Sequence, residues 1–102
     1  MEISKQFDNT IGNYDIRING KFTFADNANF RIILDHFEED KVRQITIFAG
    51  NLEFVDSAAL GMLLIARDKA IKYNKKLILI GVNGQVKKMF ELAHFDRLFN
   101  IE

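Results

Sequence analysis

The 102-residue sequence contains no cysteine, so it can form neither a disulfide nor a thiolate metal site. It has no charge excess either, because 14 basic residues balance 14 acidic ones. Nucleic-acid-binding domains normally carry a basic excess or stripe, so we expect no nucleic-acid partner. No apolar run reaches the roughly 18 residues of a membrane-spanning helix, and MEISKQFDNT at the start lacks secretory-signal features. We therefore expect a cytoplasmic protein without membrane contact.

Catalytic motifs are absent as well. His36 and His94 each lie in or at the end of a helical segment, without a partner at metal-ligand spacing. Ser57 lacks the Gly-x-Ser-x-Gly surroundings of a hydrolase nucleophile. GVNG at residues 81–84 lacks the Lys and Ser/Thr of a phosphate-binding loop. The acidic residues 38–40 are explained as a solvated helix end. The sequence thus predicts no metal, no cofactor and no enzymatic activity.

The sequence does contain enough apolar residues for one folded domain. They make up 48% of the chain, and ten of them are phenylalanine, a composition that excludes disorder. A chain of this length buries roughly two thirds of its unfolded surface. We expect residues 1–102 to form a single domain.

Period-two alternation marks the first strands. Tyr14, Ile16 and Ile18 alternate with polar residues, as in a half-buried strand. Residues 3–7 form a weaker strand candidate, expected at a sheet edge. Asn-Gly at residues 19–20 predicts a turn or a bulge.

Two further strands enclose a helix. QITIFAG at residues 44–50 and KLILIG at residues 76–81 are strand candidates, and the second is the continuous apolar run of a strand covered on both faces. The predicted helix between them, residues 57–73, suggests a right-handed crossover. We expect a small α/β domain in which a mixed β-sheet carries its helices mainly on one face.

Two other helices flank this unit. Asp26 and Asn83 are their candidate N-caps. The first helix has apolar residues at i, i+3, i+4 and i+7: Phe30, Ile33, Leu34 and Phe37. The last helix has them at Val86, Met89, Phe90 and Ala93. Three apolar residues then follow that we expect to fold back onto the core: Phe95, Leu98 and Phe99.

The junction between Asp56 and Ser57 is the most informative position. Here a strand-like segment passes into a helix, where small polar residues are preferred as N-caps. One role is structural, with the Ser57 hydroxyl or the Asp56 carboxylate capping the helix. The other is regulatory: a phosphate on Ser57 would add about −1.5 to −2 charge beside free N–H groups and a favourable dipole. The two roles are compatible.

The helix that begins at Ser57 has two predicted faces. Its apolar face consists of leucines and their neighbours: Leu60, Leu63, Leu64, Ala70 and Ile71. Gly61, Asp68 and Lys72 continue the other face from Ser57, with Ile65 beside them. Glycine inside a helix costs about 1 kcal/mol relative to alanine. We therefore expect either a neighbouring chain segment or a partner protein to approach Gly61.

These features resemble the STAS domain, and within it the bacterial anti-sigma factor antagonists. NLEFVDSAALGMLL, residues 51–64, resembles the family motif in which Asp-Ser opens a helix in the form Asp-Ser-Ser-Gly-Leu-Gly. NGKF at residues 19–22 resembles the glycine-containing strand end before the family's first helix. Residues 77–101 resemble its closing strand, helix and apolar tail. The resemblance covers nearly the whole chain and implies a STAS-like fold.

In that family the serine after the aspartate is phosphorylated by a partner kinase that is also an anti-sigma factor; here that serine is Ser57. The unphosphorylated antagonist binds the kinase and frees a sigma factor, and a metal-dependent phosphatase of the PP2C type resets it. The resemblance implies partner-switching control of transcription. The expected partner contacts are Thr23, Asp56, Ser57, Gly61 and Ile65.

The sequence departs from the family pattern at three positions. Ala58 replaces the second serine, Ala59 replaces the usual glycine, and Thr23 stands where many members carry aspartate. The resulting motif, Asp-Ser-Ala-Ala-Leu-Gly at residues 56–61, is similar to that of antagonists that work with response-regulator phosphatases. Two other functions remain as alternatives. One is a non-switching STAS scaffold or assembly subunit, which would not need the Ser57 hydroxyl. The other is a small enzyme or nucleotide-binding domain, against which the missing motifs count.

Overall fold

The alternating residues of the N-terminal part build the first hairpin of the sheet. In the computed structural model, which describes residues 1–102, β1 (Glu2–Asp8) pairs antiparallel with β2 (Asn13–Phe22). Tyr14, Ile16 and Ile18 are buried, as the period of two predicts. β1 lies at the edge of the sheet, as expected.

The remaining strands are parallel to β2. β3 (Gln44–Phe48) pairs with β2, β5 (Lys76–Ile80) pairs with β3, and β6 (Asn100–Ile101) pairs with β5. The strand order is therefore β1-β2-β3-β5-β6, and the sheet is mixed, as predicted. In β5, Leu79 belongs to the main core.

A short strand of four residues, β4 (Leu52–Val55), pairs with the second half of β2. The register shifts between Gly20 and Lys21, and Gly20 has a φ of +87°. Asn-Gly therefore marks a bulge inside a continuous strand rather than a turn, because glycine tolerates positive φ without a side-chain clash. This bulge lets β2 pair with β3 first and with β4 beyond it.

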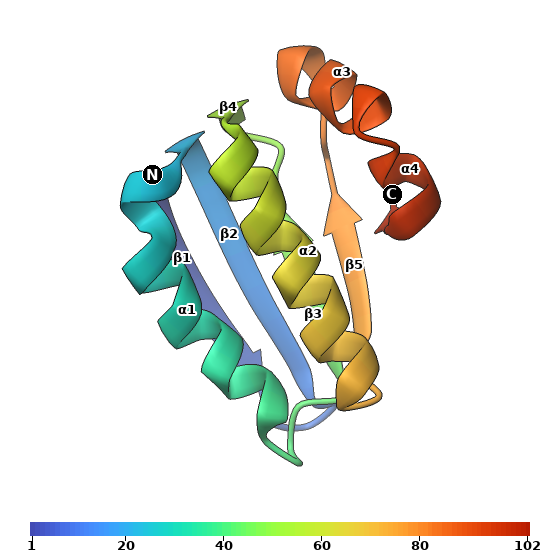
Figure 1. Ribbon diagram of the computed structural model, residues 1–102. Coiled ribbons are helices and arrows are strands. Elements are labelled where there is room, and N and C mark those ends of the chain that lie inside the picture. Colours follow the sequence, from blue (N-terminus) through green and yellow to red (C-terminus); the bar gives the residue numbers. More distant parts are fainter.

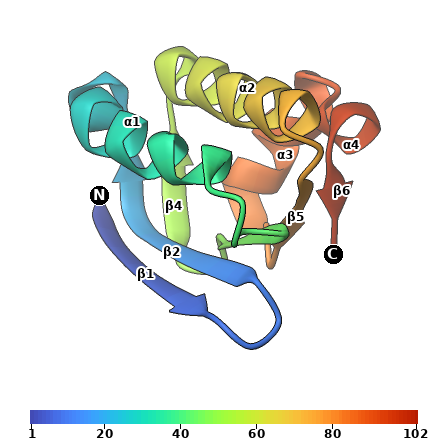
Figure 2. The same cartoon turned by 90° about the horizontal axis from the view of Figure 1, so that it is seen from below.

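Helices lie over one face of this sheet. α1 (Asn27–Asp35) and α2 (Ser57–Lys72) lie side by side above the curved strands (Figures 1 and 2). α3 (Gly84–Leu92) contacts β4, and α4 (Phe95–Leu98) contacts β6. Single 3-10 turns precede and follow α1, namely η1 (Phe24–Asp26) and η2 (His36–Glu38). The predicted architecture is confirmed.

Phenylalanine supplies much of the core between the two layers. Phe22 of β2 packs on Phe30 of α1 with ring centroids 4.9 Å apart. Phe95 contacts both Phe90 and Phe99, at 5.0 Å in each case, and all three are buried. The expected folding back of the C-terminal residues is thus correct for Phe95 and Phe99. It is wrong for Leu98, which is exposed on α4.

The predicted apolar face of α2 is correct for Leu63 and Ala70, which are buried, and wrong for Ile71. The residues that the helix buries recur at helical spacing and are mostly small: Ala59, Met62, Leu63, Ala66 and Ala70. Of the residues expected there, Leu60 and Leu64 are only half-buried, and Ile71 is 61% exposed. Alanines bring the helix axis close to the sheet, so the buried stripe is centred on them and the leucines lie on its flanks.

The two predicted N-caps also behave differently from expectation. The Asp26 carboxylate accepts no hydrogen bond from α1. It binds the N–H of Thr23 at 2.9 Å and the amino group of Met1 at 3.1 Å. Asn83 stands in the N-cap position of α3, but its side-chain amide donates to the carbonyls of Gly50 and Gly81. In both cases a tertiary partner takes the polar group away from its own helix.

Candidate functional site

Asp56 joins β4 to α2 and is the N-cap of the helix. Its backbone is extended, and its N–H donates to the carbonyl of Phe22 at 3.3 Å. Its Oδ1 accepts the N–H of Ala59 at 2.8 Å, which satisfies one of the free donors at the helix start. Of the two capping roles left open by the sequence, the Asp56 role is therefore correct.

Ser57 takes no part in this cap. It is the first residue of α2, it is exposed, and its hydroxyl makes no hydrogen bond within the protein. The hydroxyl is therefore free to meet another molecule. Ser57 lies at the positive end of the helix dipole, where added negative charge is tolerated.

The second oxygen of Asp56 fastens a distant segment beside Ser57. Oδ2 accepts the N–H of Phe24 at 3.1 Å. This bond places the start of η1, including the half-buried Thr23, next to the start of α2. Phe24 itself is 69% exposed. Phe24 was not predicted as a site residue, because an aromatic residue in KFTF, residues 21–24, is typical of a core strand, and only the tertiary contact places it on the surface.

Gly61 and Ile65 continue this surface along α2. Apart from Gly61 itself, its chain neighbours and the nearby backbone of α2, no protein atom lies within 4 Å of the position that a Gly61 Cβ would occupy. Of the two explanations for the glycine, the approach of a neighbouring chain segment is therefore wrong. Ile65 is 49% exposed, one turn further along. The structure thus brings Thr23 and Asp56 into one cluster with Ser57, while Gly61 and Ile65 extend that cluster along the helix.

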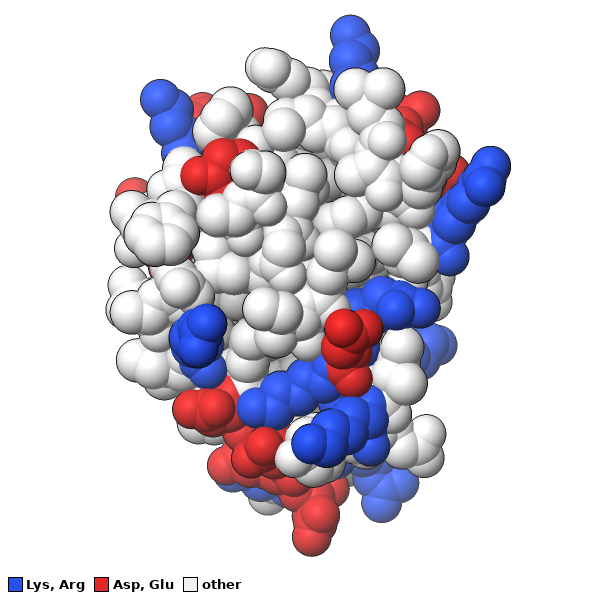
Figure 3. Space-filling model, viewed as in Figure 1, with Lys and Arg blue, Asp and Glu red and all other residues white.

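The surface over this half of α2 is almost free of charge. The first ten residues of α2, from Ser57 to Ala66, include no ionisable side chain. Figure 3 shows few charged atoms over the upper part of the helix face and a concentration of them at its lower end. Uncharged patches with exposed aromatic and aliphatic side chains are typical of protein-protein contacts. We call the residues Phe24, Ser57, Gly61 and Ile65 the α2 surface.

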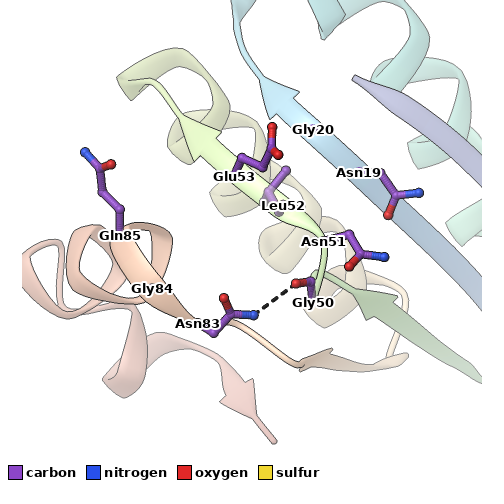
Figure 4. Close-up of a pocket in the computed structure, with 9 residues that line it drawn as sticks. All are labelled: Asn19, Gly20, Gly50, Asn51, Leu52, Glu53, Asn83, Gly84 and Gln85. Carbon is purple, nitrogen blue, oxygen red and sulfur yellow. Dashed lines mark hydrogen bonds between the residues drawn. The ribbon is translucent and has the colours of Figure 1, made fainter.

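A polar hollow of about 600 Å³ lies beside β4, next to the bulge of β2, the turn after β3 and the start of α3 (Figure 4). Asn19, Asn51 and Asn83 line it, each from a different segment, with Leu52 as the single apolar residue. The Asn83 amide closes its floor by donating to the Gly50 carbonyl at 3.0 Å. Sequence patterns did not predict this gathering, because the three asparagines are about thirty positions apart and meet only through the parallel sheet.

Ionisable groups gather at the other end of the helix layer. Glu38 accepts a hydrogen bond from the Tyr73 hydroxyl at 2.9 Å and lies 3.4 Å from the Lys69 ammonium. The Tyr73 hydrogen bond and the Lys69 charge hold the pKa of Glu38 below its ordinary value, and the same bond raises the pKa of Tyr73. The acidic residues 38–40 are thus not merely solvated, since Glu38 has two partners.

The two histidines have ordinary surroundings. His36 stacks on Tyr14 and contacts Glu39 at 3.3 Å, and His94 is exposed with a φ of +60°. No cluster of three potential metal ligands occurs in the structure. No helix is long and apolar enough to cross a membrane.

Comparison with known proteins agrees with the fold. The sequence model of the STAS domain family matches residues 3–102. A STAS-domain containing protein of Pseudomonas aeruginosa is 34% identical over 88 residues, which cover 84% of each chain. The anti-sigma-B factor antagonist of Staphylococcus aureus is 25% identical over 89 residues, which cover 86% of this chain and 82% of that protein.

Solved structures show the same architecture. The anti-sigma factor antagonist SpoIIAA in its unphosphorylated form superposes with a TM-score of 0.73 at 19% identity, covering 95% of this chain and 97% of that one. The phosphorylated form of SpoIIAA from Bacillus gives 0.77 at 17% identity, covering 99% and 91%. At these identities the likeness shows the fold, while the family model covers nearly the whole sequence. The chain therefore belongs to the STAS domain family.

Proposed function

We propose that this chain is an anti-sigma factor antagonist that acts by partner switching. With Ser57 unmodified it binds an anti-sigma factor that is also a serine kinase, and phosphorylation of Ser57 releases it. A PP2C-type phosphatase restores the binding form. The chain acts in the cytoplasm as a binding module, in keeping with anti-sigma factor antagonists, which are regulators and not enzymes.

The observation that carries this proposal is the free hydroxyl of Ser57. Asp56 caps α2, so the Ser57 hydroxyl is not needed to stabilise the helix start. A kinase can reach this hydroxyl without moving the backbone. A scaffold or assembly subunit would have no need of a hydroxyl there. The uncharged α2 surface around it offers a partner an apolar contact that excludes water, as the centres of interfaces do.

Phosphorylation would change this surface without unfolding it. The helix start tolerates the added charge. The partner, however, would meet a phosphate next to the Asp56 carboxylate, in a patch shaped around a neutral hydroxyl. Like charges brought together across an interface cost several kcal/mol. A loss of about 2–3 kcal/mol corresponds to binding weakened about 30- to 160-fold.

The test begins with the partner. A pull-down from the native cell, with mass spectrometry of Ser57, identifies the kinase and the modification together. Calorimetry then compares the kinase affinity of wild type, phosphorylated wild type, Ser57→Ala and Ser57→Asp. We expect tight binding of the first and third, weak binding of the others, and near-normal thermal stability for all four. Equal affinities for phosphorylated and unmodified protein would refute the switch and favour the scaffold.

A further inference from the structure

A second hollow lies at the lower end of Figure 1, where β1 ends, β2 begins and α1 gives way to η2. It is at the opposite end of the helix layer from Ser57 and measures about 230 Å³. Its walls come from three segments: Lys5, Gln6 and Phe7 of β1, Tyr14 of β2, and His36, Glu39 and Lys41 after α1. Neither the family resemblance nor the proposed function assigns these residues a role.

Tyr14 lines this hollow and carries an unused hydrogen-bond donor that is itself closed to solvent. The residue is only 5% exposed, and its hydroxyl is the one buried side-chain polar atom in the protein without a hydrogen-bond partner. Burial and the nearby Glu39 carboxylate raise the pKa of Tyr14, so the hydroxyl keeps its proton. Buried polar groups almost always have a partner, and an exception calls for one. The missing partner is an acceptor.

The charges around the hydroxyl favour an acceptor that is negative. Two lysines, Lys5 and Lys41, line the hollow together with one acidic residue, Glu39. Glu39 is already engaged, because its Oε2 lies 3.3 Å from His36 Nδ1. Neither lysine forms an ion pair in the structure; Lys41 lies over the Phe7 ring, 5.0 Å from its centroid. The hollow therefore combines excess positive charge with a free donor.

We propose that this hollow binds a small anion, a carboxylate or a phosphate, which accepts a hydrogen bond from the Tyr14 hydroxyl and is neutralised by Lys5 and Lys41. Charge-assisted hydrogen bonds of this kind are the strong ones. The volume suits a small ion rather than a larger cofactor. Because the hydroxyl is closed to solvent, the long side chains around the hollow must shift as the anion enters, and the ring signals of Tyr14 and His36 report that shift. The competing occupant is a water molecule.

Two titrations of the full chain followed by NMR distinguish the possible sources of the anion. Sodium phosphate is added in one and sodium acetate in the other, each compared with sodium chloride at equal ionic strength. We expect saturable shifts of the Tyr14 and His36 ring signals with at least one of the two anions. Saturation by phosphate alone identifies a phosphate site, and saturation by acetate a carboxylate site. Shifts that match those of chloride, without saturation, would overturn the proposal and leave a water on the hydroxyl.

Matched variants locate the binding. Tyr14→Phe removes only the unpartnered hydroxyl and keeps the ring, so we expect it to fold and to bind about ten- to a hundredfold more weakly. Tyr73→Phe is the control, because its hydroxyl binds Glu38 outside the hollow and its loss should leave the affinity unchanged. Lys41→Gln should also weaken anion binding. This variant tests the site even if Tyr14→Phe does not fold. Equal affinities for wild type, Tyr14→Phe and Lys41→Gln would refute the site.

Discussion

The Asp56 carboxylate binds the backbone N–H of Phe24 at 3.1 Å, across 32 positions of sequence. Its other oxygen binds Ala59 at 2.8 Å, so one side chain fixes both the start of α2 and the segment beside it. Ser57 stands between these two bonds with its own hydroxyl free. The geometry of the proposed switch therefore depends on Asp56 more than on Ser57 itself.

Replacing Asp56 should destabilise the protein, while replacing Ser57 should not. Loss of an N-cap typically costs about 0.5–2 kcal/mol, and Asp56→Ala loses a second backbone partner as well. We expect about 2 kcal/mol for Asp56→Ala. For Ser57→Ala we expect a change within about 0.5 kcal/mol, because an exposed hydroxyl without a partner is removed. Urea unfolding measures both, and equal losses would contradict the assignment of the cap.

Substitutions at Gly61 test its effect on stability and its place in the partner interface. Since no other part of the protein lies within 4 Å of its missing Cβ, Gly61→Ala should stabilise the protein by about 1 kcal/mol. Gly61→Leu should also fold, yet its side chain would overlap a partner that approaches α2 there. The thermal midpoint and the affinity for the kinase check the two halves separately. A folded Gly61→Leu protein that binds normally would exclude Gly61 from the interface.

The buried face of α2 gives a test of the packing. Leu63 is fully buried, so Leu63→Ala should lower the free energy of unfolding by about 2–5 kcal/mol. Ile71→Ala is the matched control, because Ile71 lies on the same helix with 61% of its surface exposed. Its effect should stay within about 0.5 kcal/mol. Urea midpoints that fall equally in the two variants would show that the helix is rotated.

The Glu38–Tyr73 hydrogen bond predicts a pH dependence. The pKa of Glu38 is lowered in the folded protein, so its contribution to stability is present above its unfolded pKa. That contribution is lost as the pH falls through the folded value. In Tyr73→Phe the pKa of Glu38 should rise toward normal, and its stability difference from wild type should shrink in acid. Carboxyl NMR titration and urea unfolding at several pH values measure the two effects. An unchanged Glu38 pKa would contradict the link.

Local pattern was sufficient for most elements of this fold, but it did not predict α4 or β6. Alternation identified β2, the apolar run identified β5, and helical spacing identified α1 and α3. It failed where side-chain size mattered more than hydrophobicity. Leu64 is more apolar than Ala66, but only alanine lets α2 approach the sheet closely, so Ala66 is buried and Leu64 stays half-exposed. The spacing of apolar residues alone does not indicate the distance between the helix and the sheet.

The sequence by itself determined the strand-to-helix junction at Asp56-Ser57, because capping preferences act within a few residues and depend little on the rest of the chain. Only the tertiary structure decided which groups meet there. The β2–β4 pairing carries Phe24 to the Asp56 carboxylate and leaves the Phe24 ring exposed. The same is true of Tyr14, whose burial follows from its strand but whose unpaired hydroxyl follows from the packing of η2 and the segment after it. Such contacts join residues far apart in the chain, and their geometry is set by sheet pairing and packing, which no local pattern encodes.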